Sequence, residues 1–117
     1  MNLSSQTHGS VELVCLPQRL VMANAQEART AIRGLIDDGR TRLVLDLHAV
    51  QLVDSSGLSV LVSALKALQP HDGRVVLLSP SKGVRSLIEL TRLHQVFEIF
   101  EDREAAIGEL GEREAAQ

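Results

Sequence analysis

The segment Asp54-Ser55-Ser56-Gly57 gathers a carboxylate, two hydroxyl groups and a glycine at one point of the chain. It separates an apolar run from a stretch with helical periodicity, so these residues are expected at a strand-to-helix junction. One interpretation is structural. Asp and Ser side chains satisfy free backbone N–H groups at the start of a helix, and Gly permits a tight turn.

The second interpretation is a modification site. Because a helix N-terminus stabilises anionic oxygens, a serine there can carry a phosphate without unfolding its own helix. Phosphorylation adds about −1.5 to −2 charge and three strong hydrogen-bond acceptors. Beside Asp54, that charge would repel an acidic partner and obstruct close docking onto Gly57. The residues by themselves leave both interpretations open.

Other catalytic or metal-binding patterns are absent from the sequence. The four histidines are scattered, no paired Cys/His spacing occurs, and Ser55-Ser56 lies outside any GxSxG setting. Neither a Walker loop nor a GxGxxG pattern is found. We therefore expect a binding protein that is not an enzyme, with no catalytic residues, no cofactor and no metal.

Composition restricts the partners and the compartment. Of 117 residues only Phe97 and Phe100 are aromatic, which argues against base stacking, and the net charge of −3 argues against duplex DNA. That charge is local, since residues 101–117 carry −4 and residues 1–100 carry +1. Cys15 has no disulfide partner and is expected to be a buried small hydrophobe in a reducing compartment. With no apolar segment of about 18 residues and no signal-peptide core, we expect a cytoplasmic protein without membrane insertion.

The hydrophobic pattern predicts strands alternating with helices. Strands are expected over residues 11–16, 19–22, 43–47, 75–78 and 96–100. Helices are expected to begin near Asn24, which has Glu27 in capping-box spacing, near Asp54, after Ser81 and near Asp102. This is an α/β fold with a mixed, partly parallel sheet of about four to five strands packed against about four helices. The opening pair of strands, 11–16 and 19–22, would make the sheet mixed. We expect a flexible N-terminal tail at residues 1–9, a single domain at 10–111 and an acidic C-terminal tail at 112–117.

The helix after Gly57 has two distinct faces. Its inward stripe consists of leucines and one valine: Leu58, Leu61, Val62, Leu65 and Leu68. The opposite side carries Ser59, Ser63 and Lys66, flanked by small Val60, Ala64 and Ala67. Small residues would let a partner approach closely, although an ordinary solvated face explains the same composition.

The segment Leu43-Val44-Leu45-Asp46-Leu47 … Val53-Asp54-Ser55-Ser56-Gly57-Leu58 resembles the signature of STAS domains. These are the bacterial anti-sigma factor antagonists and the related cytoplasmic domains of sulphate transporters. The order of elements resembles the family from about residue 10 to 110. The resemblance implies a STAS-like fold.

The resemblance also implies partner switching. An unphosphorylated antagonist binds an anti-sigma factor that is an ATP-dependent serine kinase, and thereby frees a sigma factor for transcription. Phosphorylation of the second serine, Ser56 here, breaks the complex, and a metal-dependent serine phosphatase restores it. By the same matching, Asp54 and Ser55 position the loop, and Gly57 allows the kinase to approach. Leu58, Ser59 and Ser63 are expected to join this partner-binding surface, and the protein is expected to be a monomer.

One position departs from the family pattern. Antagonists often carry Gly-x-Leu-Asp at the second strand, whereas this chain has Gln18-Arg19-Leu20-Val21. Val21 replaces the acid expected near the phosphorylated serine. An alternative is therefore a small STAS subunit of a lipid-transport ABC assembly that binds its ATPase without a phosphorylation cycle. A non-phosphorylated scaffold in a signalling complex is a third option.

Overall fold

The computed structural model describes the backbone of residues 3–115 and the side chains of residues 3–111. One five-stranded sheet has the order β1-β2-β4-β6-β7. Its strands are β1 (Ser4–His8), β2 (Val11–Cys15), β4 (Arg42–Asp46), β6 (Arg74–Leu78) and β7 (Ile99–Phe100). The helices are α1 (Met22–Asp37), α2 (Ser55–Leu68), α3 (Lys82–Leu90) and α4 (Arg103–Ala115). The α/β class and the mixed five-stranded sheet with four helices confirm the prediction from the sequence.

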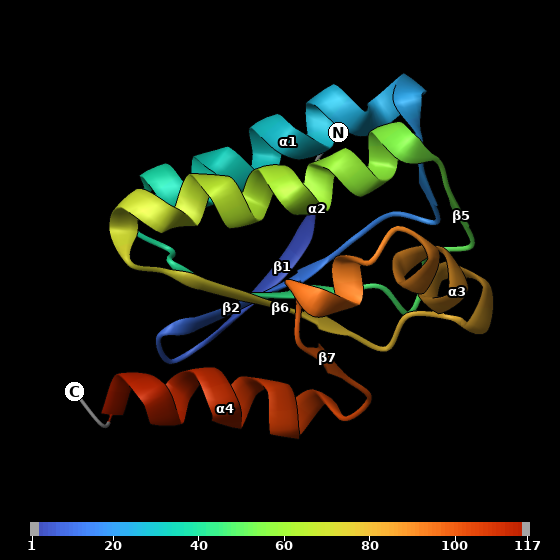
Figure 1. The fold of residues 1–117 in the computed structure, drawn as a ribbon. Coiled ribbons are helices and arrows are strands. Elements are labelled where there is room, and N and C mark those ends of the chain that lie inside the picture. Colours follow the sequence, from blue (N-terminus) through green and yellow to red (C-terminus); the bar gives the residue numbers. More distant parts are fainter. Residues whose placement is uncertain (1–2, 116–117) are drawn as a thin grey trace.

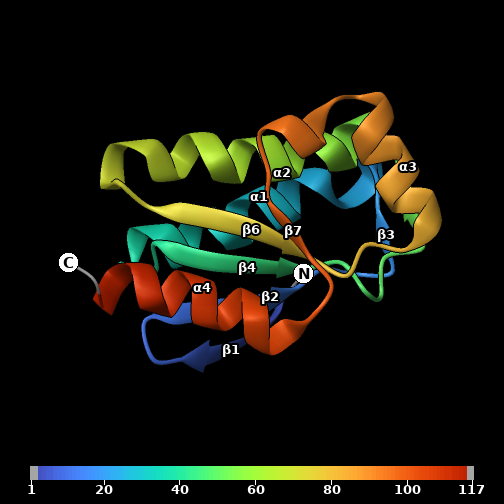
Figure 2. The same ribbon diagram turned by 60° about the horizontal axis from the view of Figure 1, so that its bottom comes forward.

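The molecule has three layers (Figures 1 and 2). Helices α1 and α2 lie side by side over one face of the sheet, α3 lies beside them, and α4 covers the other face. The central strand β4 alternates between the two cores: Leu43 and Leu45 belong to the α1–α2–α3 side, whereas Val44 belongs to the α4 side. Burial on both faces explains why this strand is a continuous apolar run. Across residues 3–115, no helix is both long enough and apolar enough to cross a bilayer.

The antiparallel pair of the sheet differs from the expected one. Strand β1 pairs antiparallel with β2, while β2, β4, β6 and β7 are mutually parallel. Residues 4–8 are therefore a strand, and the prediction of a flexible tail over residues 1–9 is wrong there. Ser4 to Thr7 are polar and exposed at the sheet edge, so no alternation of apolar residues revealed the strand. Gly9, with φ at +64°, makes the turn to β2.

A second, two-stranded sheet supports the start of α2. Its strands β3 (Arg19–Leu20) and β5 (Leu52–Val53) pair in parallel. The predicted extended segment at 19–22 therefore exists in part, but it does not pair with β2. This small sheet brings the residues before α1 against the residues before α2.

Three further element boundaries differ from those predicted from the sequence. Helix α1 begins at Met22, and Asn24 is not its N-cap; its side chain instead accepts a hydrogen bond from the backbone N–H of Val21 at 2.9 Å. The strand expected over 96–100 is shortened to β7, since a 3₁₀ turn η2 (Leu93–Gln95) precedes it and Phe97 enters the core. The expected C-terminal tail is helical to residue 115 as the end of α4, and residues 116–117 lie outside the described part.

Cys15 is partly buried and packs against the core beneath α4. Desolvation by this burial, followed by the charge of Asp46, raises the pKa of the Cys15 thiol above its usual value. Both effects disfavour the nucleophilic thiolate. The expectation of a small hydrophobe rather than a reactive thiol agrees with this setting, although Cys15 is not fully enclosed.

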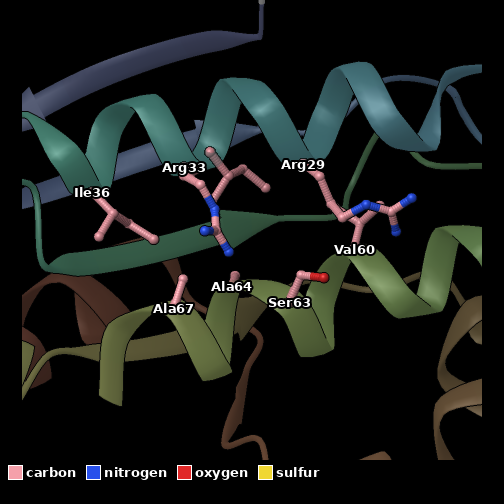
Figure 3. A pocket seen from close by; sticks show the side chains of 8 residues that line it. Arg29, Arg33, Ile36, Val60, Ser63, Ala64 and Ala67 are labelled. Atoms are coloured by element: carbon pink, nitrogen blue, oxygen red, sulfur yellow. The ribbon is translucent and has the colours of Figure 1, made fainter. Parts of the chain in front are cut away.

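Helices α1 and α2 run parallel, with both N-termini at the same end of the molecule (Figure 1). Val60 and Ala64 of α2 are at most 2% exposed and lie at the seam with α1. The expectation that they flank a free helix face is therefore wrong. Small side chains at these positions let the two helices approach each other. Ser63 and Ala67 remain partly exposed along the seam (Figure 3).

Candidate functional site

The Asp54 carboxylate joins the first turns of two helices. Its Oδ1 atom accepts a hydrogen bond from the backbone N–H of Gly57 at 2.9 Å, which caps α2. Its Oδ2 atom accepts one from the N–H of Met22, the first residue of α1, at 3.0 Å. These hydrogen bonds, that from Gly57 first, hold the pKa of Asp54 below its ordinary value. The expected role of Asp54 in positioning the loop thus has a concrete geometry, although its role toward a partner stays a prediction.

Gly57 is required by packing inside the molecule. A Cβ atom at this position would lie 2.0 Å from the carbonyl oxygen of Leu20 and 3.1 Å from Cγ2 of Val53. Only a residue without a side chain lets α2 approach the small β3–β5 sheet this closely. The resemblance to STAS domains implied that this glycine lets a kinase approach, and that role stays a prediction. Inside the molecule, its close neighbour is the backbone of β3.

The two serines occupy the first and second positions of α2. Ser55 is exposed and Ser56 is partly exposed. Among the described residues, the Ser56 hydroxyl has no hydrogen-bond partner, whereas the Ser56 carbonyl accepts a hydrogen bond from Oγ of Ser59 at 2.6 Å. A modification of the Ser56 hydroxyl would therefore break no hydrogen bond of that side chain.

Arg29 of α1 contacts the same turn of α2. Its Nη1 atom donates a hydrogen bond to Oγ of Ser59 at 2.7 Å, and its Nη2 atom donates to Oε1 of Gln26 at 3.4 Å. No motif in the sequence points to Arg29. The helical periodicity of one segment shows which face is buried, but it does not show which exposed side chain meets a neighbouring helix.

A shallow groove runs along α2 from its first turn. It lies between α2 and the segment joining α3 to η2, and its lining comprises Ser55, Leu58, Ser59, Val62, Ser63, Lys66, Thr91 and Leu93. Four predicted site residues (Ser55, Leu58, Ser59 and Ser63) thus share one surface, while Asp54 and Gly57 support it from the start of the helix. Leu90, 80% exposed, immediately precedes Thr91. Apolar exposed side chains beside hydroxyl groups are typical of a protein-binding surface.

Val21, which stands where the family pattern has an acid, precedes α1 directly. The next residue, Met22, donates its N–H to Asp54. The position therefore does lie beside the Asp54–Gly57 junction. In this chain Asp54 provides the carboxylate that contacts the start of α1.

The fold and the junction define a family. A model of the STAS domain matches residues 2–106, so the chain belongs to the STAS domain family. Two relatives match over nearly their whole length. The candidate anti-sigma factor antagonist BtrV of Bordetella bronchiseptica is 29% identical over 106 residues, 91% of each chain. The anti-sigma-B factor antagonist of Staphylococcus aureus is 26% identical over 104 residues, 89% of this chain and 96% of the relative.

Solved structures agree in fold. An anti-sigma factor antagonist from Mycobacterium paratuberculosis superposes with a TM-score of 0.83 at 25% identity, covering 93% of this chain and 92% of that one. The phosphorylated form of SpoIIAA, a Bacillus cell fate determinant, has a TM-score of 0.73 at 21% identity, covering 92% and 98%. A sulfate transporter family protein from Wolinella succinogenes shares the fold as well, with a TM-score of 0.77 at 12% identity, covering 91% of this chain and 88% of that one.

Proposed function

We propose that this protein is an anti-sigma factor antagonist that binds an anti-sigma factor and is released by phosphorylation of Ser56. The observation that carries the proposal is the Ser56 hydroxyl, which is without a hydrogen-bond partner among the described residues. Ser56 sits in the first turn of α2 and does not itself line the groove, but its neighbours Ser55 and Ser59 do. Relatives named as antagonists match along almost their entire length, which favours this function over a subunit of a transporter.

The physical basis of the switch is local charge. In the unmodified protein, the partner lies in the groove along α2 and covers the first turn. A phosphate on Ser56 places about −1.5 to −2 charge two residues after Asp54, whose carboxylate caps the same helix. The start of α2 tolerates this charge because the helix dipole and free N–H groups favour anions there. The partner must instead accept a bulky dianion in its interface, and it dissociates because burying an unpaired charge is costly.

In this proposal the anti-sigma factor is also the serine kinase, and a metal-dependent serine phosphatase regenerates the active form. The nucleotide and the metals belong to these partners, and the protein itself is their substrate. It acts in the cytoplasm as a monomer.

Phosphorylation is tested by incubating the protein with the kinase and ATP and locating the phosphate by mass spectrometry. Phosphate is expected on Ser56 in the wild type and in Ser55→Ala, and not in Ser56→Ala. Ser55→Ala is the matched control because it changes the adjacent hydroxyl on the same turn. Equal phosphorylation of wild type and Ser56→Ala would contradict the proposal.

Partner choice is tested by affinity isolation with the wild type and with Ser56→Asp. The wild type is expected to retain an anti-sigma factor, and Ser56→Asp to retain much less of it while keeping the wild-type circular dichroism spectrum. Recovery of a transporter ATPase would establish the alternative, a STAS subunit of a lipid-transport ABC assembly. An unfolded Ser56→Asp protein would favour a purely structural role of the junction.

A further inference from the structure

We propose that Arg29 of α1 is the internal receptor for the phosphate on Ser56. When Ser56 is phosphorylated, the guanidinium leaves Ser59 and pairs with the phosphate across the two helices. The inference rests on the proposed modification of Ser56, and it adds a role for a residue outside the Asp54–Gly57 junction.

Arg29 lies close enough to reach the side chain of Ser56. The Arg29 guanidinium is connected to Ser56 through a single hydroxyl: Nη1 lies 2.7 Å from Oγ of Ser59, which in turn lies 2.6 Å from the carbonyl oxygen of Ser56. Ser56 and Ser59 are three residues apart in α2, so their side chains are neighbours on one face, with Cβ atoms about 5–6 Å apart. In Figure 3, the Arg29 side chain extends from α1 toward the N-terminal end of both helices, which is the end that holds Ser56.

The positive charge of Arg29 favours a phosphate over its present partners. Within the described part of the chain, both hydrogen-bond partners of Arg29 are neutral oxygens, those of Ser59 and Gln26. The bond to Gln26 is long at 3.4 Å. The guanidinium is charged, but its present acceptors are neutral. A phosphate adds the attraction of opposite charges, and the planar fork of arginine binds two of its oxygens at once. A phosphate within reach therefore outcompetes both present partners.

The neighbouring arginine of α1, Arg33, has a different orientation from Arg29 (Figure 3). Arg33 lies one turn further along α1, and its side chain points toward Ala64 and Ala67 in the C-terminal half of α2 (Figure 3). It is therefore on the far side of Arg29 from Ser56. Arg33 serves as an internal comparison with the same charge on the same helix.

The pairing changes what a partner meets at this surface. Phosphorylation adds negative charge at Ser56 and also neutralises the positive charge of Arg29. The Ser59 hydroxyl, which lines the groove, loses its donor at the same time. One modification thus alters three features of the docking surface through side-chain movements alone.

The experiment uses the full chain with phosphoserine incorporated at position 56 during synthesis, so no kinase is required. The second pKa of the phosphate is measured by phosphorus NMR titration in the wild type, Arg29→Gln, Arg29→Lys and Arg33→Gln. A guanidinium at hydrogen-bonding distance stabilises the dianion, so this pKa is expected to be lower by ~1 in the wild type than in Arg29→Gln. Arg33→Gln should match the wild type, and Arg29→Lys should fall between.

A second measurement needs no substitution, so it remains valid even if an Arg29 variant does not fold. In the wild type, the side-chain nitrogen resonances of Arg29 should shift when unmodified protein is compared with phosphoserine protein, while those of Arg33 stay in place. An identical phosphate pKa in wild type and Arg29→Gln, or equal effects of the two arginines, would overturn the inference. Because the phosphate is installed chemically, this result is independent of whether a kinase modifies Ser56.

Discussion

Replacing Gly57 by alanine tests the close approach between α2 and β3. The added Cβ would lie 2.0 Å from the Leu20 carbonyl oxygen, whereas real Cβ atoms essentially never come within 3.0 Å of such a neighbour. The helix or the strand must therefore move by at least about 1 Å. Two hydrogen bonds lie in the path of that movement, from Met22 N–H to Asp54 Oδ2 and from Asp54 N–H to the Leu20 carbonyl.

Three contributions determine how much Gly57→Ala changes the free energy of unfolding. Overpacking costs about 1–3 kcal/mol, and weakening the two hydrogen bonds costs about 1 kcal/mol each. Alanine regains about 1 kcal/mol because it favours helix more than glycine does. The free energy of unfolding of Gly57→Ala should therefore fall by about 2–4 kcal/mol. For a domain of this size, that corresponds to a melting temperature lower by about 8–15 °C.

The assay is urea unfolding followed by far-ultraviolet circular dichroism, since the chain has no Trp or Tyr to serve as a fluorescence probe. Gly34→Ala is the matched control, because Gly34 lies within α1 and a Cβ there meets nothing within 4 Å. It should stabilise the protein by about 0.5–1 kcal/mol. If Gly57→Ala shifts the urea midpoint in the same direction as Gly34→Ala, the reasoning from the Leu20 contact is refuted.

Three further predictions concern the edge strand, the helix seam and the Asp54 cap. Deleting residues 1–9 should lower the free energy of unfolding by about 2–4 kcal/mol in urea titrations, because β1 contributes several ladder hydrogen bonds to β2; a flexible tail could be removed without effect. Ala64→Leu should cost about 1–3 kcal/mol by overpacking the α1–α2 seam, while Ala23→Leu at an exposed position of α1 should be nearly neutral in the same titration. Asp54→Asn should flatten the acid side of the stability profile. The folded pKa of Asp54 lies below its unfolded value of about 3.9, so its stabilisation is present above that value and is lost as the pH falls through the folded pKa. Thermal melts between pH 7 and pH 3 measure this, and equal slopes for Asp54→Asn and wild type would contradict it.

Much of the fold was readable from the sequence because its signals are local. The apolar run Leu43–Leu47 predicts a central strand, and the leucine spacing after Gly57 predicts α2; both are confirmed. Strand β1 could not be predicted in this way. Its residues are polar and exposed, and only the backbone hydrogen bonds to β2 define it. The pairing of β3 with β5 was also missed, since it joins segments about 33 residues apart.

The sequence predicts where the Asp54–Gly57 junction lies, but it does not predict most of the contacts that the junction makes. Asp54 as the cap of α2 follows from residue type and spacing, and the structure confirms it. The second hydrogen bond of Asp54, to Met22, required knowing that α1 and α2 begin at the same end. The same applies to Arg29 and Ser59, and to the burial of Val60 and Ala64 against α1. Contacts between elements distant in sequence depend on packing geometry, which periodicity within one helix does not encode.

The sharing of one carboxylate by two helix starts has a dynamic consequence. Breaking the contacts of Asp54 frees the N–H groups of Met22 and Gly57 together, while β4 and its neighbours keep their ladder intact. We therefore expect local opening at this end to be a single cooperative event that costs less than global unfolding. In hydrogen–deuterium exchange, the amides of Met22 and Gly57 should exchange together and early, and those of Val44 and Leu45 should exchange last. The end of the molecule that carries Ser56 is therefore expected to open locally while the sheet behind it stays folded.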